Sequence, residues 1–397
     1  MPANARVLVV GSGFAGLWAA LGAARCLDEL GARDVDVTVI SPQPYHDIRV
    51  RNYEPDLSGC RIPLRTLLDP VGVRHIAAAV RDVDTSAATV CTDDGATLNY
   101  DRLVLAMGSR VVTPDIPGLA EFGFNVDTYD AALRLQRHIR GLAPGDPASA
   151  TAVVVGAGLT GIETATELPA VLGDEVAPRV ILVDRNPRVG SDMGDSARPV
   201  ITEALRINGI EVRTATAVTA VDARSVTLST GEVIAAATVV WCAGMRAHPL
   251  TERIGVPLDG SGRLPVDDYL RVAHTSGVFA AGDVAAARMD DAHMSVMSCQ
   301  HSRPMGRYAG YNVIADLLGQ PMLPLRIPWY VTVLDLGPAG AVYTEGWDRR
   351  VVATGATAKA TKRVINRERI YPPRTGDREA LLAAAAPTLQ GAPTYGA

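Results

Sequence analysis

Two glycine-rich turns of the form Gly-X-Gly-X-X-Gly occur in this chain, and each could hold the pyrophosphate of a dinucleotide. Each turn follows a β-branched run and precedes a stretch rich in Ala and Leu, which is the strand–turn–helix context that this motif requires. The first glycine allows the tight turn, the second lets the backbone approach a pyrophosphate, and the third lets helix and strand pack closely. We therefore expect phosphates at two helix N-termini, held by Gly11, Gly13, Phe14, Ala15 and Gly16 and by Gly156, Gly158, Leu159, Thr160 and Gly161.

The elements that must position these turns are two βαβ units. Residues 6–40 read as strand, turn, helix and strand, and residues 151–184 repeat this order. Such a unit has parallel strands and a right-handed crossover. A hairpin and an apolar strand ending in glycine follow in both halves, with Gly95 matching Gly231 and Gly108 matching Gly244. The pattern indicates a duplicated nucleotide-binding domain.

The remaining chain adds other elements. Residues 277–283 form an apolar run, GVFAAGD, and residues 298–319 predict a helix that tolerates Pro304 in its first turn. From residue 329 onward, alternating apolar residues and Gly-rich turns predict antiparallel strands. Residues 374–397 are rich in Ala, Pro, Gly and Thr and predict a flexible tail, frayed or weakly helical in the short stretch REALLAAAA.

Composition narrows the function classes. The chain has 397 residues, 48% of them hydrophobic, which suffices for two or three domains. A net charge of −5 gives no electrostatic argument for a nucleic-acid partner. The N-terminus runs directly into a strand, and no apolar window is long enough for a transmembrane helix. We expect a cytoplasmic protein whose membrane contact is at most peripheral, at the inner face, and we expect no metal.

The five cysteines are scattered, without a CxxC or CxxxxC pair. Disulfide frameworks and metal sites need closer clustering. If the protein transfers electrons, it does so without a cysteine pair.

Taken together, several segments resemble the two-nucleotide flavoprotein reductases, and most of all the type II NADH dehydrogenases (NADH:quinone oxidoreductases). These segments are GSGFAGLWAA, YDRLVLAMGSR, VVVGAGLTGIETATEL, TVVWCAGMRAHPL, GRLPVDDYLRV and GVFAAGDVAAA. The resemblance implies an α/β fold with two Rossmann-like dinucleotide-binding domains and a small C-terminal antiparallel β/α region. It implies a discontinuous FAD domain at 1–112 and 265–325, an inserted NAD(P)H domain at 113–264, and an interface or acceptor region at 326–373.

For the FAD site, the resemblance implies that Asp283 completes the pocket begun by the first turn. The alternative for an Asp before a helix is a simple helix cap. Ser41 stands where an acidic residue is common in FAD sites, and a hydroxyl makes a weaker bond to a ribose than a carboxylate does. His46 resembles flavin-adjacent residues of relatives, and Ala106 and Gly108 belong to the same site.

The second turn, with Gly244 nearby, is expected to hold the nicotinamide nucleotide. Asp184 ends the following strand, where a carboxylate accepts hydrogen bonds from the adenosine ribose and repels a 2′-phosphate, so NADH is favoured over NADPH. Arg185 and Arg188 weaken this argument, because a nearby arginine accommodates that phosphate. Glu163 has the position of a glutamate that helps place NADH or tune proton movement in relatives. Its alternative role is favourable charge at a helix N-terminus.

The acceptor side is less defined. Gln300 keeps one of two glutamines that line the quinone site in type II NADH dehydrogenases, but Pro304 replaces the second. His301 could donate a proton to a reduced acceptor or serve as a structural hydrogen-bonding group. The stretch IRVRNY fits a plain strand or an acceptor wall.

Other features bear on the acceptor and on assembly. The aromatic residues Trp329, Tyr330 and Trp347 wall the acceptor pocket, form core, or face a homodimer partner. The segment AKATKRVIN offers positive charge for peripheral membrane contact.

The function predicted from these features is a FAD-dependent NAD(P)H dehydrogenase that passes hydride from NADH to FAD and then two electrons to a quinone-like acceptor. One alternative is a soluble reductase that serves a protein partner or a pathway-specific small molecule. Another is a redox-sensing flavoprotein with little turnover.

Overall fold

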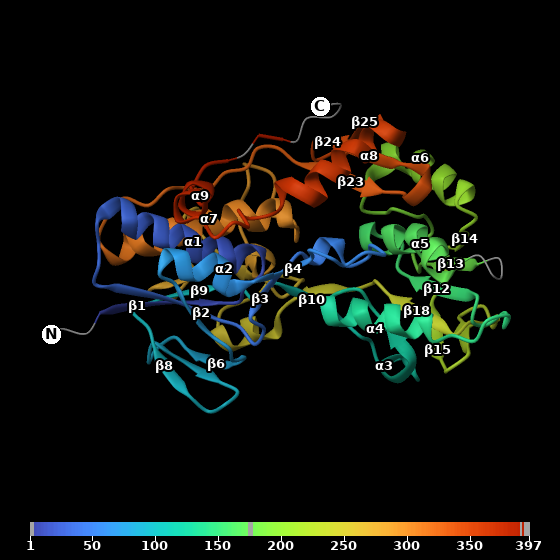
Figure 1. The fold of residues 1–397 in the computed structure, drawn as a ribbon, viewed down its shortest axis with the longest axis horizontal. Helices are drawn as coiled ribbons and strands as arrows, with labels where there is room; N and C mark the ends of the chain where they lie inside the picture. The colour runs from blue at the N-terminus through green and yellow to red at the C-terminus, as the bar shows by residue number, and fades with distance from the viewer. Residues whose placement is uncertain (1–3, 174–177, 390, 393–397) are drawn as a thin grey trace.

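Two five-stranded parallel sheets form the frame of the computed structural model, which describes residues 4–173, 178–389 and 391–392 (Figure 1). The first sheet has the order β21-β9-β1-β2-β5. Its strands are β1 (Ala5–Val10), β2 (Val35–Ile40), β5 (Arg74–Ile76), β9 (Arg102–Leu105) and β21 (Val278–Ala280). Because β21 pairs with β9, a strand from late in the chain completes the sheet that the N-terminus begins.

The second sheet repeats the plan with the order β11-β18-β12-β13-β14. Its strands are β11 (Gly123–Phe124), β12 (Thr151–Val155), β13 (Arg179–Val183), β14 (Glu211–Arg213) and β18 (Thr238–Trp241). Helix α1 (Phe14–Leu30) follows β1, and α5 (Leu159–Leu172) follows β12. Each half also carries a three-stranded antiparallel sheet, formed by β6 (Val80–Asp84), β7 (Thr89–Thr92) and β8 (Thr97–Asn99) and by β15 (Val218–Val221), β16 (Ser225–Leu228) and β17 (Val233–Ala235).

Shorter elements join the two halves. Strand β10 (Ser109–Val111) pairs antiparallel with β19 (Met245–Ala247), so both connections between the halves run side by side. The remaining elements are β3 (Tyr45–Asp47), β4 (Arg61–Pro63), α2 (Leu64–Leu68), α3 (Leu119–Phe122), α4 (Tyr129–Arg140), α6 (Gly194–Ile207), β20 (Leu264–Pro265) and β22 (Ala285–Ala286). The predicted α/β fold class is confirmed; the domain boundaries stay a prediction.

The C-terminal part packs across both halves (Figure 1). Helix α7 (Cys299–Leu317) lies along α1, and the antiparallel strands β23 (Val331–Asp335), β24 (Ala341–Glu345) and β25 (Arg350–Thr354) lie near α5 and α6. Helix α8 (Gly355–Val364) continues into a π-helical turn at Ile365–Arg369, and α9 (Arg378–Ala384) follows. Among the described helices, none combines the length and apolar composition needed to cross a membrane.

Helices α1 and α7 approach each other closely because glycines face the contact. A Cβ at Gly306 would overlap the carbonyl oxygen of Ala15, and one at Gly310 would overlap that of Ala19. Small residues at such positions let two helices pack backbone to backbone. The side chains at the edges of this contact are therefore held in fixed positions.

Within the tail at 374–397, Arg378–Ala384 form α9, whose Leu381 and Leu382 are buried, and Arg378 pairs with Asp28 of α1. Two other local predictions need correction. The segment IRVRNY is not a strand: residues 49–51 form a 3-10 helix, which lets Arg51 turn inward to Glu54. Pro304 lies in the second turn of α7, where its missing N–H leaves the Gln300 carbonyl without its helical donor.

Candidate functional site

The first glycine-rich turn has the geometry of a nucleotide cradle. Gly11 adopts a φ of +107°, and a Cβ there would overlap the Ala106 carbonyl oxygen. A Cβ at Gly16 would overlap the carbonyl oxygen of Gly11. At Gly13, in contrast, a Cβ would find nothing within 4 Å. The outer glycines therefore serve the fold, while Gly13 leaves open space at the N-terminus of α1.

The second turn has the same division of roles. Gly156 has a φ of +106°, and a Cβ at Gly161 would overlap the Gly156 carbonyl oxygen. A Cβ at Gly158 would find no atom closer than the Asp192 carboxylate, at 3.6 Å. Both cradles are thus open at the middle glycine, where a pyrophosphate approaches the backbone.

His46 lies directly against the first cradle, on β3. Its Nδ1 donates to the Ser12 carbonyl oxygen at 2.9 Å, and its ring meets Phe14 edge-on. Burial lowers the pKa of His46 to about 4, so the ring is neutral. Its Nε2 is then a buried acceptor with no partner among the described residues, which fits a hydroxyl donor of a ligand.

Ser41 directly follows β2, but its hydroxyl already has hydrogen-bond partners. It donates to the Gln43 carbonyl oxygen at 2.9 Å, and His75 Nε2 lies 3.0 Å away. The hydroxyl is buried. A bond from Ser41 to an adenosine ribose stays a prediction that its surroundings do not favour.

Asp283 reaches the first cradle because β21 joins the first sheet. Gly282 just before it packs on Ala15 with a φ of +76°. The Asp283 carboxylate accepts from the hydroxyls of Ser109, at 2.6 Å, and Ser302, at 3.2 Å. The structure therefore brings Asp283 beside the N-termini of α1 and α7, and its own chain supplies some of its donors.

A single cavity of about 920 Å³ extends from the second cradle to α7. Gly244, with a φ of +82°, lines it, whereas Gly108, with a φ of +72°, occupies the matching position in the other half. The predicted site residues in its lining are Gly156, Gly158, Leu159, Thr160, Glu163, Asp184 and Gln300. Residues far apart in the sequence therefore share one continuous space.

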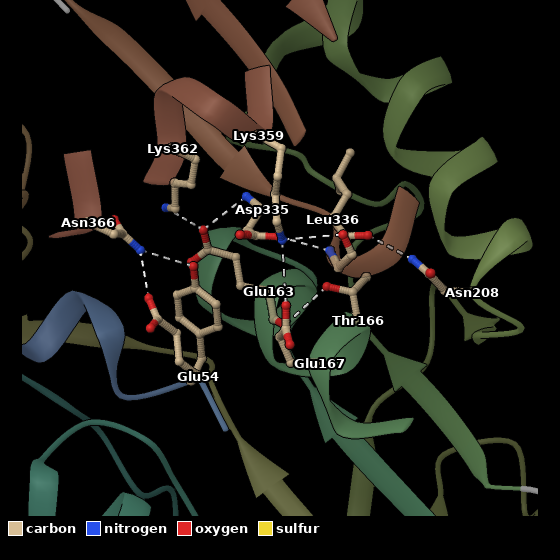
Figure 2. Close-up of polar contacts among 12 residues, drawn as sticks. Glu54, Glu163, Thr166, Glu167, Asn208, Asp335, Leu336, Lys359, Lys362 and Asn366 are labelled. Atoms are coloured by element: carbon tan, nitrogen blue, oxygen red, sulfur yellow. Dashed lines mark hydrogen bonds and ion pairs between the residues drawn. The ribbon is translucent and has the colours of Figure 1, made fainter. Parts of the chain in front are cut away.

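Glu163 lines this cavity and forms a buried ion pair with Lys362 of α8, which lines it too (Figure 2). Lys362 Nζ donates to Glu163 Oε1 at 2.7 Å and to the Val333 carbonyl oxygen at 3.0 Å. Burial acts to lower the pKa of Lys362, but the Glu163 carboxylate raises it by more than burial lowers it. The pKa is therefore above its ordinary value, and the ammonium stays charged. Burial raises the pKa of Glu163 against the effect of Lys362.

The neighbouring charges extend this pair into a cluster (Figure 2). Lys359, one turn earlier on α8, bonds Asp335 and lies 3.8 Å from Glu167. Lys359 and Lys362 are the only lysines in the chain, and both face α5. They are turned toward the interior, so the membrane role predicted for this segment receives no support from them.

Asp184 stands at the end of β13, beside the second cradle. Its Oδ2 accepts from the Ala157 backbone N–H at 2.5 Å, and its Oδ1 accepts from that of Asn186 at 2.7 Å. These bonds hold the carboxylate in place at the cavity wall. Each oxygen keeps a second lone pair for another donor.

The N-terminus of α7 presents Cys299 and Gln300 to the cavity. Gln300 Nε2 is buried without a partner in the described part of the chain. His301 does not line the cavity: its Nδ1 accepts from the Val296 N–H at 2.8 Å, and burial lowers its pKa to about 4. We therefore do not propose His301 as a proton donor.

The aromatic residues predicted near the acceptor divide into two groups. Trp329 and Tyr330 line the cavity. Trp347 stacks behind Tyr330 with ring centroids 5.0 Å apart, and His293 stacks on Trp347 at 4.3 Å. Trp347 thus supports the wall without forming its surface.

The chain resembles known proteins in sequence and in fold. The sequence profile of the pyridine nucleotide-disulphide oxidoreductases matches residues 5–306. The chain belongs to that family. It is 66% identical to an NADH dehydrogenase-like protein of Mycobacterium tuberculosis, over 98% of this chain and 100% of the relative.

One further relative in sequence and one solved structure of similar fold complete the comparison. The chain is 27% identical to a type II NADH:quinone oxidoreductase of Staphylococcus haemolyticus, over 92% of this chain and 95% of the relative. A sulfide:quinone oxidoreductase from Aquifex aeolicus superposes with a TM-score of 0.77 at 19% identity, covering 94% and 92% of the two chains. The predicted resemblance to NADH dehydrogenases is confirmed.

Members of this oxidoreductase family use FAD and a pyridine nucleotide, and the two open cradles fit two dinucleotides. The orphaned Nε2 atoms of His46 and Gln300 fit polar atoms of a bound group. Despite the family's name, all five cysteines are free thiols. Reduction of a disulfide within the chain is therefore not part of what this geometry offers.

Proposed function

We propose that this flavoprotein is an NADH dehydrogenase that delivers two electrons to a quinone-like acceptor. The overall reaction is NADH + H⁺ + quinone → NAD⁺ + hydroquinone. The observation that carries the proposal is the single cavity, which joins the second cradle, the Glu163–Lys362 pair and Gln300. The residues of the first cradle are not in that lining, so the meeting of electron donor and acceptor at one flavin is part of the proposal.

We assign FAD to the first cradle, with Gly13, His46 and Asp283 as its holding residues. FAD supplies the ability to take a hydride and to pass its two electrons on. The protein's contribution is orientation, because hydride transfer needs alignment of the two rings more than it needs an acid or base. The α7 N-terminus, capped by Ser298, adds a positive helix end beside Gln300.

We assign the handling of charge in the cavity to Glu163 and Lys362, which both line it. Their ion pair holds a proton on Lys362 Nζ in a buried position next to Tyr53. Hydroquinone formation consumes protons, so a buried ammonium and carboxylate at this point suit the chemistry. Glu163 is thereby proposed as a functional residue.

The proposal includes a preference for NADH over NADPH. Asp184 is fixed by two backbone donors at the cavity wall, where a ribose hydroxyl would find an acceptor and a 2′-phosphate would meet a negative charge. Arg185 also lines the cavity. Because Asp184 is held rigidly, we give its carboxylate the greater weight.

Asp184→Asn tests this preference. The amide keeps the shape but removes the charge, so we expect the ratio of kcat/KM for NADH to that for NADPH to fall roughly tenfold, the loss of about one charge-assisted hydrogen bond. Steady-state rates with both nucleotides and one quinone measure the ratio. An unchanged ratio would remove Asp184 from the argument.

The acceptor class is tested by reoxidation. After anaerobic reduction with NADH, stopped-flow mixing with menadione, with a one-electron redox protein and with oxygen compares the three classes. We expect the quinone to reoxidise the protein fastest. Faster reoxidation by the redox protein would replace the quinone with a protein partner, and negligible rates with all three would favour a sensor.

A further inference from the structure

Helix α7 carries two buried arginines that pair with no carboxylate of the described residues. The exposed fraction is 7% for Arg303 and 3% for Arg307. Neither forms an ion pair within residues 4–173, 178–389 and 391–392, and the Nε of each is buried without a partner there. Arg307 donates one hydrogen bond, to the Thr388 carbonyl oxygen at 3.3 Å.

Both guanidinium groups are held in place by Trp18 of α1. Their central carbons lie 5.3 Å (Arg303) and 4.8 Å (Arg307) from the centroid of the indole ring, a cation–π arrangement. The glycine-mediated contact of α1 with α7 fixes this arrangement, because Gly306 packs against Trp18 itself. The two arginines are one helical turn apart, so they face the same way.

A third cation comes from another element. Arg369, at the end of the π-helical turn after α8, lines the same cavity as Arg303 and Arg307. Burial is the main cause that lowers the pKa of Arg303 and of Arg307, and the charge of Arg369 lowers both as well. The pKa of Arg303 falls to about 10. All three remain cations at neutral pH, gathered on one wall.

Such a gathering is unfavourable unless an anion completes it. A buried charge without a partner is costly, and arginines are retained in such places where planar anions bind bidentately. None of the three arginines pairs with a carboxylate of the described residues, and the lining of the same cavity includes the apolar Ile370 and Leu389. The wall fits an apolar molecule that carries one acidic group.

We infer that the electron acceptor of this protein carries an acidic group, a carboxylate or a phosphate, which Arg303 and Arg307 bind while Arg369 adds to the field. The inference rests on the proposed function, because it concerns the acceptor of that reaction. The acidic group takes no part in the electron transfer. It fixes the position of the reducible ring relative to Gln300, which lies three residues before Arg303 and seven before Arg307 on α7.

The test compares a matched pair of acceptors on the FAD-loaded protein. One is a menadione derivative with a carboxypropyl side chain, and the other is its methyl ester, which has the same ring without the charge. We expect kcat/KM for the acid to exceed that for the ester by at least about tenfold. In Arg303→Met and Arg307→Met this preference should disappear, while the rate of anaerobic reduction by NADH stays unchanged.

Two further readouts separate binding from structure. Methionine keeps the length of the side chain and removes an uncompensated charge, so neither variant should lower the Tm of the protein. Arg206→Met, at an exposed position of α6, is the control and should keep the preference for the acid. A lipid headgroup has the same chemistry, so flotation with phosphatidylglycerol vesicles forms a separate arm, in which we expect the two variants and the wild type to behave alike.

The outcomes are distinct. Equal rates with the acid and the ester would overturn the inference, while the proposed function as a quinone reductase would still stand. Loss of FAD in the variants would assign the arginines to the flavin, and loss of vesicle binding without an acid preference would assign them to a lipid. If NADH reduces the protein but neither quinone reoxidises it, the proposed function fails together with the inference.

Discussion

Lys362→Met is expected to destabilise the protein by about 3–5 kcal/mol, because it leaves the Glu163 carboxyl buried without its cation. The pKa of Glu163, already raised by burial, would rise further, and the carboxyl would take up a proton. The hydrogen bond to the Val333 carbonyl oxygen is lost as well. Urea unfolding of the FAD-loaded protein at neutral pH measures the change, with the exposed neighbour Arg363→Met as control.

The double variant Glu163→Gln/Lys362→Met distinguishes structure from function. With both charges gone, stability should return to within about 1–2 kcal/mol of the wild type, since replacing a whole buried pair costs little. Turnover of NADH with a quinone should stay low, because the proposed handling of protons needs the pair. A double variant as unstable as the single one, or one with full turnover, would contradict this account of the pair.

Gly13→Ala is expected to weaken FAD binding roughly ten- to hundredfold without unfolding the protein. A Cβ finds open space there and the φ of −71° suits alanine, so only an approaching pyrophosphate loses its hydrogen bond, about 1.5–3 kcal/mol. Gly16→Ala is the matched contrast. Its Cβ overlaps the Gly11 carbonyl oxygen, so the fold itself should lose about 1–3 kcal/mol or more.

The same pair of changes in the second turn should affect the other nucleotide. Gly158→Ala, at a φ of −83°, should keep FAD bound and raise the Kd for NADH. Gly161→Ala should instead destabilise the fold. Equilibrium dialysis for FAD and anaerobic titration with NADH measure the two affinities. If Gly158→Ala lost FAD and Gly13→Ala lost only NADH, the assignment of the cradles would be reversed.

The sequence predicts the frame of this protein well because its signals are local. Each Gly-rich turn stands between its own strand and helix, so the two parallel sheets follow from short segments. Local signals do not place Asp283. Only the GD motif and the family resemblance linked it to the first turn, which lies more than half of the chain away.

The parts that the sequence does not predict depend on contacts between distant segments. Lys362 meets Glu163 from 199 residues away, and a lysine in AKATKRVIN reads as a solvent-facing charge. Arg303 and Arg307 likewise read as the polar face of a helix. Their burial follows from Trp18 and from the glycines of α7, and the one signal in the sequence was the i, i+4 spacing of the two arginines beside Gly306.

One measurement tests the central claim most directly: anaerobic titration of the purified FAD-loaded protein with NADH, followed by addition of a quinone. The account predicts that an equimolar amount of NADH bleaches the visible absorbance of the flavin and that the quinone restores it, with one hydroquinone formed per NADH consumed. A protein that cannot be loaded with FAD, or whose flavin stays oxidised in excess NADH, would contradict the account.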